Sequence, residues 1–322
     1  MKAVLVEDGE LRVGEADAPA LVAGSLRIAV AAAGVNRADL MQRRGLYPPP
    51  PGASAVLGLE CAGEVLEVGE GVTGWAPGDR VMALLAGGGY AEEVVVDAGS
   101  AMPVPDAFSL TEAAVFPEVY LTVFSNVFQI AALEAGDTLL VHGGGSGIGT
   151  ASIQLAVEAG ARVLVTAGSP EKCERCLELG AALAVDYREQ DFAQEVARVT
   201  DGAGVEVILD SIGAGYLEPN LASLAVGGRL VLIGLMQGAK AEINLGALLS
   251  RRLQVIGSTL RAKSAAQKAS IVAGLTGQFG AAIEAGRLRP VVHEVFGLET
   301  ASEAHALMQA SGHFGKIALA VR

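Results

Sequence analysis

The sequence predicts a two-domain α/β protein, in which a mostly β domain precedes a doubly wound, six-stranded parallel sheet. Three observations lead to this prediction. Short apolar runs separated by Gly, Pro and Asp fill residues 1–115. Strands and helices alternate regularly from 138 to 257, and a glycine-rich turn joins the first of these strands to the helix after it.

The composition indicates a globular protein with a large core. Of 322 residues, 51% are hydrophobic and 18% are charged, which fits two folded domains better than a disordered chain. The formal charge of −13 disfavours nucleic acid and membrane surfaces as partners, because both attract clustered Lys and Arg. The absence of a signal-peptide pattern, of a long apolar run and of a disulfide framework predicts a cytoplasmic protein.

The first part of the chain is expected to be rich in short strands. The runs KAVLV, SLRIAVAAAGV, LECAGEVLEVG, DRVMALL and YAEEVVV are bounded by turn-forming residues, which is typical of a partly barrel-like β region. From 111 to 133 the pattern predicts a helix with a break at Pro117, because proline lacks the backbone N–H that a helix interior requires.

The middle of the chain predicts the parallel sheet. The expected strands are 138–142, 162–167, 183–186, 205–210, 229–234 and 252–257, and the expected helices begin near Ser146, Pro170, Asp191, Gly215 and Gly246. A helix at 264–285 is followed by a strand, a helix and a strand, which we expect to return to the N-terminal β region. The expected domains are therefore 1–117 with 259–322, and 118–258.

The stretch VHGGGSGIGT, residues 141–150, predicts a dinucleotide-binding turn. A buried strand precedes it and an amphipathic helix follows, so the free N–H groups and dipole of the helix N-terminus would favour a pyrophosphate. Glycines here allow a tight turn, close approach of the phosphates and close helix–strand packing. The expected contacts are His142, Gly144, Ser146, Gly147, Ile148 and Gly149. A purely structural turn is the alternative interpretation.

The end of the next strand favours NADP over NAD. An NAD site usually carries an acidic residue there, which holds the ribose 2′-hydroxyl, but this strand ends in Ala167-Gly168-Ser169. No carboxylate repels a 2′-phosphate, and Lys172 follows one helical turn later. A helix lysine that only faces solvent is the alternative interpretation of Lys172.

The stretch NRADLMQRRGLYPPPPGASAVLGLECAGEV, residues 36–65, resembles the zeta-crystallin-type quinone oxidoreductases, which are zinc-independent medium-chain dehydrogenase/reductases. It is most similar to the branch typified by the tumour-suppressor-inducible quinone oxidoreductase. VMALLAGGGYAEEVVV, FPEVYLTVFSNVF, VTAGSPEK and LVLIGLMQG carry the same likeness, which extends from Met1 to the terminal GKIALAVR. The resemblance implies a GroES-like catalytic domain, a Rossmann domain, NADPH in the cleft between them, and a homodimer formed through the sixth strand.

The resemblance also implies roles for individual residues. It assigns the 2′-phosphate to Lys172 and Tyr187, with Gly168 and Ser169 beside the adenosine ribose. The other cofactor contacts that it implies are Thr122, Val123, Gly234, Leu235, Met236, Ser258, Thr259, Leu260 and His313. Asn36 and Tyr47 match positions that line the reacting ring and the substrate pocket. A helix cap for Asn36 and a loop anchor for Tyr47 are the alternative interpretations.

The sequence disfavours a metal. Zinc alcohol dehydrogenases place a Cys and a Gly-His-Glu motif at the catalytic zinc, and here Asn36 and Leu59 stand at the Cys and His positions. The four-cysteine structural lobe is absent, and Cys173-x-x-Cys176 has no partner pair. Glu60 is expected to hold Arg37 or a backbone amide in the vacated metal pocket.

Three functions remain after these considerations. Without a Lewis acid the acceptor must be easy to reduce, which favours an NADPH-dependent reductase of quinones. The second function is an enoyl-thioester or enone reductase, for which only Arg43-Arg44 and Arg251-Arg252 offer basic pairs. The third is a protein that binds NADPH without much turnover.

Overall fold

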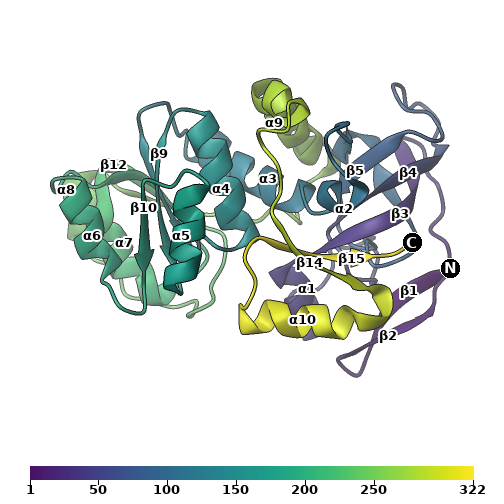
Figure 1. Cartoon of the computed structure of the whole chain (residues 1–322), viewed down its shortest axis with the longest axis horizontal. Coiled ribbons are helices and arrows are strands. Elements are labelled where there is room, and N and C mark those ends of the chain that lie inside the picture. The colour runs from purple at the N-terminus through teal and green to yellow at the C-terminus, as the bar shows by residue number, and fades with distance from the viewer. The chain divides into compact units, whose positions relative to one another are not determined.

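The computed structural model describes all 322 residues and divides them into two compact units. One unit contains residues 1–121 and 260–322, and the other contains residues 122–259. We call them the discontinuous unit and the central unit. Each has its own sheet and its own buried core (Figure 1).

The central unit is built on a six-stranded sheet in which every pairing is parallel. The strand order is β10-β9-β8-β11-β12-β13, which confirms the predicted doubly wound fold. The strands are β8 (Thr138–His142), β9 (Arg162–Ala167), β10 (Leu183–Asp186), β11 (Val205–Asp210), β12 (Leu224–Leu232) and β13 (Gln254–Gly257). Because all six run in one direction, their carboxyl ends meet at the same edge of the sheet.

Helices cover both faces of this sheet. Figure 1 shows α4 and α5 on one face and α6, α7 and α8 on the other. Their bounds are α4 (Gly147–Glu158), α5 (Pro170–Glu178), α6 (Phe192–Val199), α7 (Leu217–Ser223) and α8 (Leu245–Arg251). Buried aliphatic side chains such as Leu140, Leu164 and Ile208 form one cluster with residues of α6, α7 and α8.

The discontinuous unit contains a seven-stranded, mostly antiparallel sheet. Its order is β14-β15-β3-β4-β5-β7, with β6 paired to β3 and a separate hairpin formed by β1 and β2. The strands are β1 (Lys2–Glu7), β2 (Glu10–Glu15), β3 (Ser25–Val35), β4 (Glu60–Val68), β5 (Arg80–Leu84), β6 (Glu93–Asp97), β7 (Ala101–Pro103), β14 (Val292–Gly297) and β15 (Lys316–Ala320). The C-terminal β15 pairs with β3, so the end of the chain completes a sheet begun at its start.

The expected helix at 111–133 divides into three segments. These are α2 (Leu110–Ala113), α3 (Pro117–Val123) and a π-helical turn (Phe124–Ile130). Pro117 begins α3 because proline is tolerated at the first position of a helix. The remaining helices are α1 (Arg37–Arg43), α9 (Ala265–Glu284) and α10 (Ala301–Ala310).

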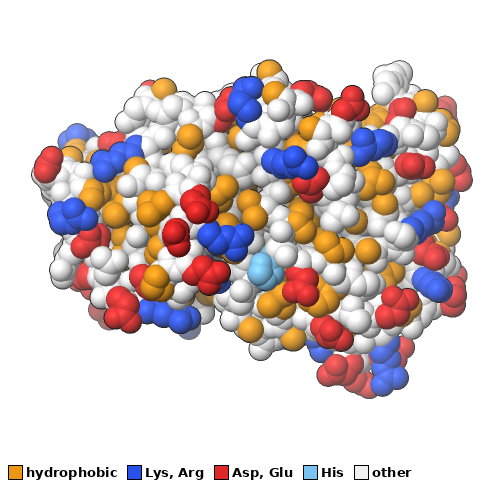
Figure 2. Space-filling model, viewed as in Figure 1, with side chains coloured by type: hydrophobic (Ala, Val, Ile, Leu, Met, Phe, Trp, Pro, Cys, Tyr) orange, Lys and Arg blue, Asp and Glu red, His pale blue; other side chains and the backbone are white.

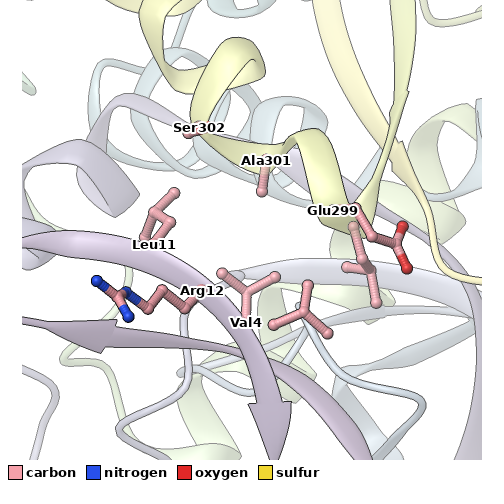
Figure 3. Close-up of a pocket in the computed structure, with 8 residues that line it drawn as sticks. Val4, Leu11, Arg12, Glu299, Ala301 and Ser302 are labelled. Atoms are coloured by element: carbon pink, nitrogen blue, oxygen red, sulfur yellow. The ribbon is translucent and has the colours of Figure 1, made fainter.

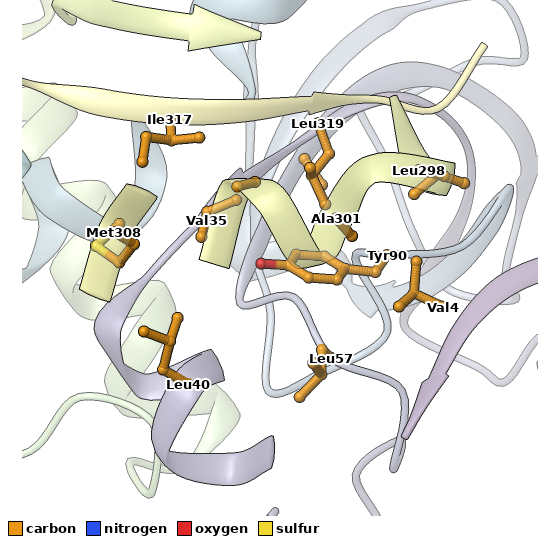
Figure 4. Packing of buried hydrophobic residues seen from close by; sticks show 12 residues of the cluster. Val4, Val35, Leu40, Leu57, Tyr90, Leu298, Ala301, Met308, Ile317 and Leu319 are labelled. Carbon is orange, nitrogen blue, oxygen red and sulfur yellow. The ribbon is translucent and has the colours of Figure 1, made fainter. Parts of the chain in front are cut away.

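Tyr90 lies within the core that joins both ends of the discontinuous unit. Its ring is buried among Val4, Leu57 and Ala301 (Figure 4). Its hydroxyl lies 3.2 Å from Asp39 Oδ2 and 3.2 Å from His305 Nε2. Side chains from the first and last parts of the sequence therefore share one core.

The surface carries charges of both signs. On the face shown in Figure 2, acidic and basic side chains are interspersed and no extended basic area is visible. No helix has the length and apolar character needed to cross a membrane.

Candidate functional site

The glycine-rich turn connects β8 to α4 at the carboxyl edge of the central sheet. Gly143 adopts the left-handed φ of 79°, so it is the glycine that supplies the tight turn. Gly144 instead packs against β9, where an added Cβ would lie 2.7 Å from Cβ of Val165. Gly149 allows close packing, because a Cβ there would overlap the carbonyl oxygens of Gly143 and Gly144.

Ser146 fixes the start of α4. Its hydroxyl accepts a hydrogen bond from the Gly149 N–H at 3.0 Å and donates one to the Gly143 carbonyl at 2.7 Å. The N–H groups of Gly147 and Ile148 precede the first possible intrahelical bond, so the helix itself gives them no acceptor. This turn lies between β8 and β11, where the strand order reverses, which is the usual place for a ligand in such sheets.

His142 holds the end of β8 in place. Its Nε2 lies 2.7 Å from Asn220 Oδ1 and its Nδ1 lies 3.1 Å from Thr166 Oγ1, so both ring nitrogens have protein partners. Burial lowers the pKa of His142 to about 4, and the ring is therefore neutral at pH 7. His142 therefore supports the glycine-rich turn indirectly, by holding the end of β8 that leads into it.

The predicted 2′-phosphate residues gather at the ends of β9 and β10. Tyr187 packs on Gly168, where an added Cβ would lie 2.6 Å from the tyrosine hydroxyl. Ser169 caps α5 by accepting the Lys172 N–H at 3.3 Å. Burial lowers the pKa of Lys172, and the nearby charge of Arg188 lowers it further. Sequence reasoning missed Arg188, although it directly follows Tyr187.

The other expected cofactor residues fall into two groups. At the carboxyl edge of the central sheet lie Gly234, Leu235, Met236, Ser258 and Thr259, which follow β12 and β13. Thr122 and Val123 are buried at the end of α3. Leu260 and His313 are buried within the discontinuous unit, where the rings of His313 and His293 are 6.4 Å apart.

A buried ion pair lies where two strands of the discontinuous unit begin and a third strand ends. Lys316 begins β15, Glu60 begins β4, and Asn36 directly follows β3. The Lys316 Nζ lies 2.7 Å from Glu60 Oε1, and it donates to Asn36 Oδ1 at 2.5 Å and to the Val35 carbonyl at 2.9 Å. The exposed fractions of the Lys316 and Glu60 side chains are 3% and 0%.

Asn36 and a backbone amide complete the network around Glu60. Asn36 Nδ2 donates to Glu60 Oε1 at 2.9 Å, and the Glu118 N–H donates to Glu60 Oε2 at 2.8 Å. Of the two partners expected for Glu60, Arg37 or a backbone amide, the structure shows the backbone amide. Arg37 instead donates to the Met308 carbonyl and to Ser311 Oγ, each at 3.3 Å.

The loop that contains Tyr47 is held by an arginine that sequence reasoning also missed. Arg261 is buried and donates to three oxygens, those of the Tyr47 carbonyl (3.2 Å), the Ala86 carbonyl (2.9 Å) and the Gln42 side chain (2.6 Å). Its guanidinium carbon lies 5.3 Å from the centre of the Tyr47 ring, within cation–π range. The aromatic ring is thus fixed while remaining partly exposed.

The cysteines do not form a reactive or metal-binding set. Cys61, Cys173 and Cys176 are all buried, and burial raises the pKa of Cys176 to about 12. Thiols with raised pKa values are poor nucleophiles and poor metal ligands at pH 7.

Two hollows lie away from the residues described above. One, of about 130 Å³, is in the discontinuous unit between the β1–β2 hairpin and α10, and Figure 3 shows Leu11, Arg12 and Ser302 beside it. The other, of about 260 Å³, includes Asp137 and Arg229 and lies near the amino ends of the central strands. Neither contains a predicted site residue, and the second lies at the edge opposite the glycine turn.

Two known families match the sequence. Residues 22–106 match the family described as "Alcohol dehydrogenase GroES-like domain", and residues 147–273 match the family described as "Zinc-binding dehydrogenase". The second match begins within the glycine-rich turn. It includes the residues expected at the 2′-phosphate, which are Gly168, Ser169, Lys172 and Tyr187.

Curated relatives are of two kinds. The chain is 31% identical over 303 residues to a quinone oxidoreductase of Rattus norvegicus, which covers 94% of this chain and 90% of the rat protein. It is 32% identical over 299 residues to a phenolphthiocerol/phthiocerol polyketide synthase of Mycobacterium tuberculosis. That alignment covers 92% of this chain but only 13% of the synthase polypeptide, so the chain corresponds to one segment of a much longer protein.

Solved structures also match the whole length of this chain. A mycobacterial protein solved as a complex with NADPH matches with a TM-score of 0.89 and 30% identity, over 100% of both chains. The CurK enoyl reductase matches with a TM-score of 0.86 and 28% identity, over 100% of this chain and 99% of that one.

The residues at the zinc position do not fit a zinc ion, although one matching family is described as zinc-binding. Leu59 is apolar and 1% exposed, and the Lys316 ammonium already lies against Glu60 and Asn36. A divalent cation there would face a fixed positive charge instead of a set of His and Cys donors. No group of three or more His, Cys, Asp or Glu in the chain is arranged to hold a metal.

Removal of the Lys316 charge tests how much the ion pair contributes to the free energy of unfolding. We expect Lys316→Met to lower the free energy of unfolding by about 3–5 kcal/mol, because it leaves the Glu60 carboxylate buried and unpaired. The double variant Glu60→Gln with Lys316→Met should lose less than Lys316→Met alone, since it removes both charges. Urea denaturation at pH 7 measures both, with Lys240→Met at an exposed position as the control. A loss below about 1 kcal/mol for Lys316→Met contradicts this prediction.

Proposed function

Since the chain belongs to the medium-chain dehydrogenase/reductase family, we propose that it is an NADPH-dependent oxidoreductase that reduces quinones without a metal. The observation that carries the proposal is the Lys316 ammonium beside Glu60, at the position that zinc relatives use for their metal. Because the Lys316–Glu60 ion pair occupies that place, the site offers no Lewis acid that could activate an alcohol or a simple ketone. An acceptor that is already electron-poor suits such a site.

The choice of NADPH is supported by charge at the end of β9. Burial lowers the pKa of Lys172 and the charge of Arg188 lowers it further, so the two cations are near enough to repel each other. A 2′-phosphate bound between these two cations and the Tyr187 hydroxyl would relieve their repulsion. When bound, NADPH supplies a hydride from C4 of its nicotinamide ring.

The residues of the discontinuous unit position the acceptor in this proposal. Tyr47 presents a fixed ring on which a flat quinone can stack, and Arg261 keeps that ring in place. Asn36 has both amide atoms engaged, with Lys316 and with Glu60, so we assign it a positioning role through the ion pair. We also propose a cytoplasmic location, from the charge of −13 and the free cysteines.

An enoyl-thioester or enone reductase is the second candidate. The polyketide synthase relative and the CurK enoyl reductase favour it. One arginine of each basic pair that would receive a long phosphorylated arm is engaged elsewhere, because Arg43 pairs with Glu10 and Arg251 donates to the Leu221 carbonyl. This observation ranks quinones first.

Turnover with a panel of acceptors separates these functions. NADPH oxidation is measured with 1,2- and 1,4-quinones, with simple enones and with enoyl-CoA esters. The proposal predicts the highest kcat/KM for a quinone. A higher kcat/KM for an enoyl-CoA ester would favour the second candidate, and no turnover with any acceptor would favour a protein that only binds NADPH.

Lys172 is expected to determine coenzyme choice. A charge-assisted hydrogen bond contributes about 1.5–3 kcal/mol, or roughly ten- to a hundred-fold in affinity. NADPH should therefore bind at least about tenfold tighter than NADH, and Lys172→Ala should remove most of that difference. Fluorescence titration of both coenzymes checks this, with Lys240→Ala as the control. Equal loss of NADH and NADPH affinity in Lys172→Ala would instead mean that Lys172 supports the fold or the pyrophosphate.

Tyr47 is expected to act on the acceptor and not on the coenzyme. Tyr47→Ala should lower kcat/KM for quinones several-fold, because aromatic stacking contributes about 0.5–1.5 kcal/mol. Tyr47→Phe keeps the ring and tests the hydroxyl alone. The affinity for NADPH should not change in either variant. Unchanged quinone kinetics together with a lower Tm would show that Tyr47 is only a loop anchor.

We further propose a homodimer formed through β13. This strand is at the edge of the central sheet, and its Val255 is 37% exposed. An unpaired apolar edge strand favours association with another strand. Light scattering should give twice the chain mass for the wild type and a shift toward the monomer for Val255→Lys, whereas Val226→Lys, at an exposed position of β12, should remain dimeric. A monomeric wild type would contradict this.

A further inference from the structure

Arg261 is a buried cation whose hydrogen-bond partners are all neutral. The residue is 5% exposed, and each of its three side-chain nitrogens has one acceptor. Nε donates to the Ala86 carbonyl at 2.9 Å, Nη1 to the Tyr47 carbonyl at 3.2 Å and Nη2 to Gln42 Oε1 at 2.6 Å. No carboxylate lies within 4.0 Å of the guanidinium nitrogens, so Arg261 forms no ion pair.

Comparable cations in the same unit do have carboxylate partners. The Lys316 ammonium lies 2.7 Å from Glu60, and the Arg27 guanidinium pairs with Glu67 at 3.2 Å and with Glu93 at 3.3 Å. A buried charge that lacks such a partner costs stability. A neutral amide could donate to carbonyl oxygens without this cost, so hydrogen bonding alone does not account for a positive charge at position 261.

The carboxyl groups that act on Arg261 do not neutralise it by contact. Asp39 accepts hydrogen bonds from the Asn36 and Gly58 N–H groups, and neither Asp39 nor Glu118 forms an ion pair with the guanidinium. Burial lowers the pKa of Arg261, but arginine stays charged at pH 7 in proteins. The site therefore holds a permanent positive charge that no ion pair balances.

The position of this charge is fixed by its partners. Arg261 bridges the Tyr47 carbonyl and the Ala86 carbonyl, which belong to two different loops. The same two loops are joined by a main-chain hydrogen bond from the Gly88 N–H to the Val56 carbonyl at 2.8 Å. A charge held in this way needs no reorganisation when a ligand changes its own charge nearby.

The ring of Tyr47 links the buried charge to an accessible surface. The guanidinium carbon lies over this ring, 5.3 Å from its centre, and the ring is partly exposed whereas Arg261 is buried. Stacked rings have their centres about 4.5–7 Å apart. A flat acceptor that stacks on Tyr47 would therefore lie about 10 Å from the guanidinium.

We propose, on the premise of the function proposed above, that Arg261 stabilises the negative charge that a flat acceptor gains during reduction, and that it acts through the ring of Tyr47. The quinone takes up a hydride, with its two electrons, from the nicotinamide, and NADPH is oxidised to NADP⁺. The quinone thereby becomes a quinolate anion, and one proton from water completes the quinol. The charge of Arg261 favours this anion over the neutral quinone, which lowers the barrier without tightening the binding of the substrate.

Coulomb's law gives the size of the expected effect. Two unit charges about 10 Å apart, at an effective dielectric constant of about 20, attract each other enough to change a rate or an affinity roughly tenfold. The same attraction acts on a ligand whose ring is already negative. We therefore expect the site to bind flat phenolates more tightly than neutral rings of the same shape.

Two substitutions of Arg261 separate its charge from its hydrogen bonds. Arg261→Gln removes the charge and Arg261→Lys keeps it, while both lose the three-way hydrogen bonding. With 1,4-naphthoquinone, which is neutral, Arg261→Gln should lower kcat about tenfold at unchanged KM, and Arg261→Lys should keep kcat within about twofold. A merely structural role would lower kcat alike in both variants, and that result would overturn the proposal. Arg12→Gln, the same change at an exposed position, should behave as the wild type.

Ligand binding to the wild type tests the charge without any substitution, so it decides the matter even if the variants do not fold. At pH 9, 4-nitrophenol is an anion, whereas 4-nitroanisole has a similar flat ring and is neutral. Calorimetry should show roughly tenfold tighter binding of the nitrophenolate. Equal affinities for the two compounds would overturn the proposal.

The outcomes also separate this proposal from the proposed function. If the wild type reduces quinones and Arg261→Gln keeps kcat within about twofold, only the role of Arg261 is wrong. If the wild type reduces neither quinones nor enones, the proposed function is wrong and the role of Arg261 in reduction falls with it. The preference for a phenolate is measured without turnover and is judged by calorimetry alone.

Discussion

The ammonium group of Lys316 lies against the carboxylate of Glu60 at a point where β15 and β4 begin and β3 ends. Two charges this deeply buried are stable only as a pair with further hydrogen bonds, which Asn36, Val35 and Glu118 provide. The pair requires β15 to lie beside β3, so it links the register of the C-terminal strand to the N-terminal sheet. Gly34 is part of the same constraint, because a Cβ there would overlap the Glu60 carboxylate.

The same pair limits the chemistry of the discontinuous unit. The Lys316 ammonium is buried and surrounded by the oxygens of Glu60, Asn36 and Val35, so it is not placed to polarise a substrate. In the proposed function, activation therefore comes from the acceptor itself, with Tyr47 as the partly exposed group that positions it. In the proposed function, the central unit contributes the coenzyme side, through a turn shaped by Gly143, Gly144 and Gly149 and through the cations Lys172 and Arg188.

Local signals in the sequence explain what could be predicted. The strands 138–142, 162–167, 183–186 and 205–210 agree with β8 to β11, because buried parallel strands give continuous apolar runs bounded by turns. β2 was missed because its ELRVGE sequence is mostly exposed, and β7 because it has only three residues. The contacts of Glu60 with Lys316, and of Arg261 with Tyr47, had no local signal, since each joins residues more than two hundred positions apart. The role of Gly143 also needed the backbone φ angle, because several adjacent glycines fit the motif equally well.

Metal content measured together with turnover tests the central claim most directly. The protein is dialysed against a strong chelator, its zinc per chain is determined by mass spectrometry, and NADPH oxidation with a quinone is measured on the same sample. The account predicts full turnover at negligible zinc, with no gain when zinc is restored, because Lys316 and Leu59 leave no place for the ion. Turnover that rises in proportion to bound zinc would contradict it.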